Sequence, residues 1–184
     1  MRWQRLFADL EAQAEALAAG DFEAEVAERT RIEVGKLRLG DRLRATLGHP
    51  VQIDCMGAGI LGGRLEEVGA GWLLLVEDPG REVLVCLPAV MSIVGLGTLS
   101  TAPGSEGRVG SRLDLRHTLR GIVRDRAPVQ VVLLDGTRLG GTLDRVGADF
   151  VELAEHAWGE PRRAAAVRRV RTVPLTALAA VRTW

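Results

Sequence analysis

The feature that most constrains this chain is an internal repeat. Residues 48–77 and 126–155 align without a gap at a constant offset of 78 positions. Twelve of the 30 aligned pairs are identical, namely those at Pro50, Val51, Gln52, Leu61, Gly62, Gly63, Leu65, Val68, Gly69, Ala70, Leu75 and Glu77. Matched spacing over this length indicates that one structural unit occurs twice. We therefore expect two related units in one chain.

Each copy of the repeat has the pattern of a short helix followed by five strands. Apolar residues at helical spacing predict helices over 39–47 and 115–123. Short apolar segments bounded by turns predict strands at Val51–Met56, Ile60–Val68, Trp72–Val76, Glu82–Leu87 and Met91–Leu96, and again at Val129–Leu134, Arg138–Val146, Phe150–Ala154, Val167–Val173 and Ala177–Arg182. This order predicts a mainly β fold with N-terminal helices, in which two tandem five-stranded barrels are each preceded by a short helix.

Turn and strand residues add detail to each copy. Asp135-Gly136 is a strong hairpin signal between the first two strands of the second copy. The glycine pairs at 62–63 and 140–141 predict a bend or bulge inside the second strand. Alternation along the strands places four leucines in the interior, namely Leu65, Leu75, Leu143 and Leu153.

The remaining segments define the domain layout. Residues 1–35 are predicted to form an acidic helical hairpin with its break at Gly20-Asp21. The first barrel is expected at 36–97, a Gly/Ser/Thr-rich linker at 98–111, and the second barrel at 112–184. The second copy also carries an insertion of about eight or nine residues around 156–166. The hairpin's acidic face is either solvated or a docking surface for a protein partner or the Arg-rich half.

Composition narrows the function classes. Hydrophobic residues make up 47% of the chain, enough for a packed core, whereas aromatics make up 4% and Tyr is absent. That argues against binding nucleic acid mainly by base stacking. No catalytic constellation, metal-ligand spacing or cofactor motif is readable, so we expect a non-enzyme without cofactors. Cys55 and Cys86 lie in apolar runs and are expected to be buried free thiols. With no leader and no membrane-spanning run, a cytoplasmic location is expected.

Charge is unevenly distributed between the two halves. Residues 1–107 contain 10 Arg/Lys and 16 Asp/Glu, whereas residues 108–184 contain 14 Arg and 8 Asp/Glu. Either the halves attract each other or the second half binds a polyanion. Candidate nucleic-acid-binding residues are a stretch on the inserted hairpin and a stripe on the second opening helix, comprising Arg162, Arg163, Arg168, Arg169, Arg171, Arg112, Arg116, Arg120 and Arg124. Arginine forks suit phosphate geometry. The alternative is a solvated hairpin and a helix face paired with Asp125 or with the acidic N-terminal hairpin.

The pattern resembles the Sm-like (LSm and Hfq) family, and SH3-like barrels share much of it. The resembling segments are 131–136, 139–143, 146–151 and 173–178 in the second copy and, more loosely, 61–65, 68–72 and 87–88 in the first. The resemblance implies helix-capped five-stranded barrels, self-association through edge strands and RNA as a ligand. The residues with which that family reads bases are absent, because Val151 or Leu73 replaces its Asn and Leu175-Thr176 replaces its basic pair.

Two functions therefore stand as hypotheses. The first is a non-catalytic RNA-binding Sm-like module, a regulator of RNA metabolism or gene expression. The second is a protein-interaction or assembly scaffold without a nucleic-acid role. Self-association fits both, because free strand edges tend to pair.

Overall fold

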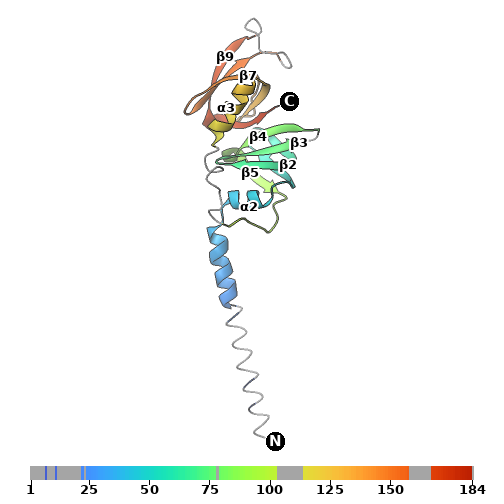
Figure 1. Cartoon of the computed structure of the whole chain (residues 1–184), viewed down its shortest axis with the longest axis vertical. Coiled ribbons are helices and arrows are strands. Elements are labelled where there is room, and N and C mark those ends of the chain that lie inside the picture. Colours follow the sequence, from blue (N-terminus) through green and yellow to red (C-terminus); the bar gives the residue numbers. More distant parts are fainter. Residues whose placement is uncertain are drawn as a thin grey trace. The chain divides into compact units, whose positions relative to one another are not determined.

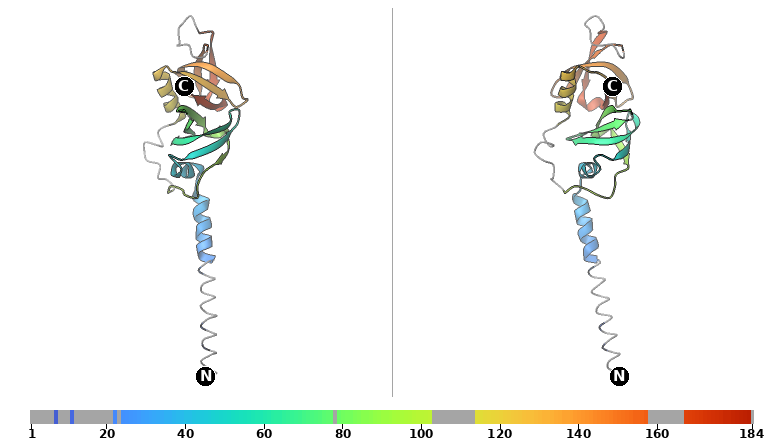
Figure 2. Two further views of the ribbon diagram at one scale, coloured as in Figure 1. Left: turned by 90° about the vertical axis from the view of Figure 1, so that its right-hand side faces the viewer. Right: turned by 45° about the vertical axis from the view of Figure 1, so that its right-hand side comes forward.

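The computed structural model describes residues 7, 11, 22, 24–77, 79–102, 114–157 and 167–183, and the chain divides into two compact units, Met1–Arg38 and Leu39–Trp184 (Figures 1 and 2). In the first unit residues 24–36 are helical. Exposed ion pairs at helical spacing, such as Glu25–Arg29 and Glu33–Lys36, support this helix. The predicted break at Gly20-Asp21 lies outside the described residues.

The second unit contains both copies of the repeat. The first copy has α2 (Leu39–Ala45), β1 (Pro50–Cys55), β2 (Gly59–Gly69), β3 (Trp72–Glu77), β4 (Arg81–Cys86), η1 (Leu87–Ala89) and β5 (Val90–Val94). The second has α3 (Leu115–Asp125), β6 (Pro128–Leu133), β7 (Arg138–Val146), β8 (Phe150–Glu155), β9 (Arg169–Pro174), η3 (Leu175–Ala177) and β10 (Leu178–Arg182). The mainly β prediction with a helix before each set of five strands is confirmed.

The strands of both copies form one continuous sheet. Its order is β5-β1-β2-β3-β4-β10-β6-β7-β8-β9, and every pair of neighbouring strands is antiparallel. The joint between the copies is the pair β4·β10, in which Val85 lies opposite Ala180 and Leu84 opposite Val181. In Figure 1 the first copy runs from light blue at α2 to light green and the second from yellow at α3 to red, with α3 against β7.

The repeat predicted from the sequence is reproduced in the strand register. Gln52 pairs with Gly62, and Gln130 with Gly140. The fifth strands follow at an offset of 88, because Ile53 pairs with Ile93 as Val131 pairs with Val181. The insertion therefore has ten residues, the difference between the offsets of 88 and 78, and not eight or nine.

The glycine pairs at 62–63 and 140–141 do not form the bulge in the second strand. The register shift in the second strand lies beyond them, between Leu65 and Glu67 and again between Leu143 and Arg145. A Cβ on Gly63 would lie 2.6 Å from a carbonyl oxygen of the adjacent strand, and one on Gly141 would lie 2.2 Å from another. The second glycine of each pair is thus required because the adjacent strand's backbone comes close to it. The bulge lies two to four residues further along the same strand.

The two hydrophobic cores share residues across the joint. Val132, Ala179 and Ala180 of the second copy belong to the core of the first. Trp72, Leu84 and Cys86 of the first copy belong to the core of the second. The four predicted interior leucines are at most 1% exposed, which confirms the strand phase; they are Leu65, Leu75, Leu143 and Leu153. Each copy therefore depends on the other to complete its core.

Candidate functional site

The arginine stripe on α3 is only partly neutralised. The side chain of Asp114, the N-cap residue, accepts a hydrogen bond from the backbone N–H of His117 at 2.8 Å. It also accepts one from Arg116 Nη2 at 2.6 Å, and these bonds, the Arg116 bond foremost, hold the pKa of Asp114 below its usual range. Arg120 and Arg124 are exposed and have no hydrogen bond or ion pair with any described residue. Within the described part of the chain the stripe thus has two guanidinium groups without a bonded partner, and Arg112 lies outside that part.

The arginines of β9 are tied to one carboxylate. Arg169 Nε donates to Glu155 Oε2 at 2.6 Å, and Arg171 Nε donates to Glu155 Oε1. Burial opposes the ionisation of Glu155, but the hydrogen bonds from Arg171 and Arg169 outweigh it and lower the pKa of this carboxyl. Arg168 is exposed just before the strand. Two members of the basic segment are therefore paired with Glu155, a partner that the sequence did not predict, whereas Arg162 and Arg163 lie outside the described residues.

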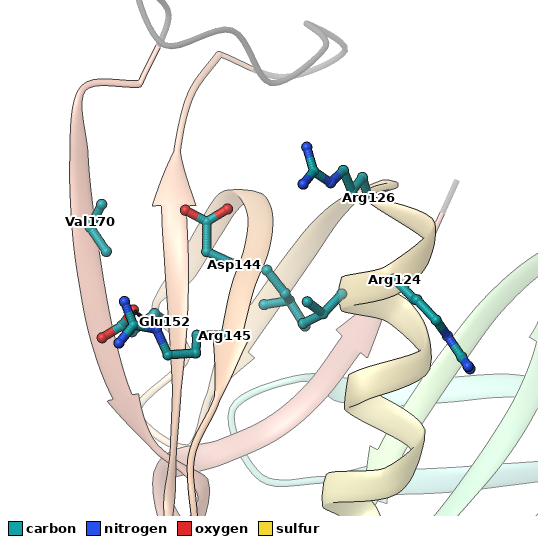
Figure 3. A pocket seen from close by; sticks show the side chains of 8 residues that line it. Arg124, Arg126, Asp144, Arg145, Glu152 and Val170 are labelled. Carbon is teal, nitrogen blue, oxygen red and sulfur yellow. Dashed lines mark ion pairs between the residues drawn. The ribbon is translucent and has the colours of Figure 1, made fainter.

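A pocket of about 670 Å³ lies between the end of α3 and strands β7, β8 and β9 (Figure 3). Arg126, which ends α3 with φ 52°, extends toward the same open space as Asp144, whereas Arg124 points away from them (Figure 3). Arg145 is paired with Glu152 at 3.2 Å on the pocket wall. Three arginines and two carboxylates line the pocket, and Arg145 and Glu152 already neutralise each other, so the pocket suits no strongly charged ligand on electrostatic grounds.

Nucleophilic and metal-binding chemistry is weakly represented in the described part of the chain. There, no group of three or more His, Cys, Asp and Glu side chains could hold a metal ion. Cys55 and Cys86 are buried and unpaired, as predicted, and burial raises the pKa of Cys86 to about 12, so its thiol stays protonated. His156 is buried, with Nε2 2.9 Å from Thr142 Oγ1 and Nδ1 3.0 Å from the Ala157 carbonyl oxygen. That pair joins β7 to the end of β8 and serves the fold.

At the β5 end of the sheet, side chains are more exposed than their equivalents at the corresponding positions of the second copy. Met91 on β5 is 62% exposed, whereas Ala179 at the same position of β10 is fully buried. Val94 is 65% exposed, whereas the side chain of its equivalent, Arg182, is 16% exposed. Met56, at the end of β1, is 43% exposed, whereas its equivalent Leu134 packs against the first core. We call Met56, Met91 and Val94 the β5 face.

Sequence reasoning missed the β5 face. A fifth strand was predicted in each copy, but the two sequences do not show that β10 pairs with a strand on both sides while β5 lies at the end of the sheet. Met91 corresponds to Ala179 and Val94 to Arg182, but this mismatch emerges only with the offset of 88 that the strand register gives.

Comparison with protein-family models, curated proteins and solved structures found no match. Among the described residues no helix has both the length and the apolar character needed to cross a bilayer.

Proposed function

We propose that this protein is a non-catalytic assembly scaffold whose copies associate through the free edges of the ten-stranded sheet. The observation that carries the proposal is the exposed β5 face, whose equivalent positions in the second copy are covered by the first copy. A strand edge presents unpaired backbone N–H and C=O groups, and exposed apolar side chains beside such an edge favour strand addition.

The energetics are adequate for a specific but reversible contact. Fully burying a Val or Met side chain contributes about 1.5–3 kcal/mol. Three such side chains on each partner, with the added backbone hydrogen bonds, can exceed the lower part of the association cost of about 4–15 kcal/mol. Micromolar association is therefore the expected range.

We further propose that each copy of the repeat is a five-stranded Sm-like barrel. The strand order supports this, because β1 lies between β2 and β5 in the first copy and β6 lies between β7 and β10 in the second. In both copies a 3-10 turn after a fourth strand leads directly into the fifth, which returns to the first strand.

Sedimentation velocity of the full chain over a range of micromolar concentrations tests the scaffold function. The expected result is a mass above that of the monomer at the upper concentrations, with reversible dissociation on dilution. A monomer at every concentration would contradict the proposal.

A second candidate function is RNA binding through phosphate contacts, which the available guanidinium groups of Arg120, Arg124 and Arg126 favour. Affinity for a single strand would then fall with salt by a log–log slope of about −0.7 per neutralised phosphate. Replacing Arg120 and Arg124 with Ala should flatten that slope, whereas Arg138→Ala, at an exposed position on β7, serves as the control. Absence of binding at about 100 mM salt would leave the scaffold function alone.

A further inference from the structure

We propose that two copies of the chain join through β5 of each, antiparallel about a two-fold axis, so that their sheets become one. This inference rests on the proposed scaffold function and specifies its partner and symmetry. The occupant of the β5 edge is thus the same edge of a second copy.

The two edge strands, β9 and β5, differ in whether they carry charged side chains and proline. Strand β9 carries Arg169 and Arg171 on its length and ends at Pro174. Charged side chains and proline are the means by which natural sheets prevent further strand addition. Strand β5 reads Val-Met-Ser-Ile-Val and has neither a charge nor a proline. Edge β9 is therefore protected, and edge β5 is open to pairing.

A head-to-tail contact, in which β9 of one copy repeats the β4·β10 joint on β5 of the next, fits poorly. Transferring the register of that joint would place Arg171 opposite Val94 and Thr172 opposite Ile93. In the β4·β10 joint, Val83 lies opposite Arg182 and Leu84 lies opposite Val181. Arg171 and Thr172 would thus take the positions of Val83 and Leu84, which are both buried. A polar strand would thus replace an apolar one.

Two further features of the internal joint have no counterpart in the head-to-tail contact. The joint holds an ion pair between Arg182 and Glu77 at 3.8 Å, and the equivalent positions are Val94 and Glu155. Glu155 is already paired with Arg169. In addition, the fully buried Ala179 corresponds to Met91, whose larger side chain would not fit the same space.

A two-fold contact matches the chemistry of β5. The strand is irregular at Met91, because the register on β1 shifts between Asp54 and Cys55, so its regular part is Ser92–Val94. With Ile93 at the axis, Ser92 of one copy lies opposite Val94 of the other, and side chains of the same face meet. Val94 of each copy then lies against β5 of the other, and closed two-fold dimers are the commonest form of homo-oligomer.

The matched test uses one exposed valine on each edge. Val94 on β5 is 65% exposed and Val170 on β9 is 56% exposed, so lysine at either site should leave the fold intact, which far-UV circular dichroism checks. Sedimentation of the full chain is expected to show a wild-type dimer that Val94→Lys weakens at least about tenfold. Val170→Lys should leave the dimer unchanged.

The alternative outcomes separate the inference from the proposed function. If Val170→Lys dissociates the assembly, or if the wild type grows beyond a dimer, the contact is head-to-tail; the two-fold inference then fails while the scaffold function stands. A monomeric wild type, or an assembly that neither lysine affects, overturns both.

Cross-linking provides a second readout of the axis. Paired antiparallel strands bring opposite Cα atoms to about 4.5–5.5 Å, within the range that a disulfide spans. Ile93→Cys alone should therefore form a disulfide-linked dimer under mild oxidation, and wild type, whose two thiols are buried, should not. A disulfide that forms only when Ile93→Cys is mixed with Thr172→Cys would refute the two-fold arrangement.

Discussion

The packing of the first copy against β6 of the second can be tested at Gly57. This residue lies in the turn from β1 to β2 with φ +74°, and a Cβ placed on it would lie 2.0 Å from the carbonyl oxygen of Leu133 on β6. Gly59, two residues later, has φ +75° and open space around its Cβ position. The two glycines therefore share a backbone conformation and differ in what an added methyl group meets.

This difference sets the expected magnitudes. A left-handed conformation costs a non-glycine residue about 1–2 kcal/mol, and that penalty applies to both substitutions. Gly57→Ala must also move the two copies apart at the joint, since the clashing atom is backbone, and overpacking of this kind costs about 1–3 kcal/mol more. We expect a loss of about 1–2 kcal/mol for Gly59→Ala and about 2–5 kcal/mol for Gly57→Ala.

Urea denaturation followed by tryptophan fluorescence measures both losses. A lower midpoint with an unchanged slope would report stability alone. Equal losses for the two variants would refute the reasoning, because they would mean that the turn at Gly57 does not pack tightly against β6.

Three further predictions concern individual side chains. Leu143→Ala should lower the free energy of unfolding by about 2–5 kcal/mol, measured by urea denaturation, and a loss below about 0.5 kcal/mol would show that this strand position is not core. Glu155→Gln should destabilise the chain at neutral pH; because the folded pKa of Glu155 is lowered, the difference from wild type should shrink as the pH falls from the ordinary glutamate pKa through the lower folded value, and a difference independent of pH would contradict the ion pairs with Arg169 and Arg171. Cys86, with a pKa raised to about 12, should react with a thiol reagent at mildly alkaline pH only after unfolding, and fast reaction in the native state would contradict its burial.

The repeated unit and much of its interior follow from local sequence patterns. Alternation with a period of two is a local property, so the burial of Leu65 and Leu143 could be predicted from their strands alone. Asp135-Gly136 likewise specified its turn, in which Gly136 has φ +87° and Asp135 accepts a hydrogen bond from the Thr137 N–H. The gap-free offset carried the leucine positions from one copy to the other, whereas the Asp-Gly pair belongs to the second copy alone.

The way the copies join and the choice of end strands depend on contacts between segments that are distant in the sequence. Every strand edge offers the same backbone donors and acceptors, so the sequence could not show that β4 pairs with β10 while β5 and β9 stay at the ends. The partners of the arginines were equally hidden, because Glu155 meets Arg169 only through the register of β8 on β9. Packing between distant strands, which no local pattern encodes, left Met91 exposed and buried Ala179 at the equivalent position.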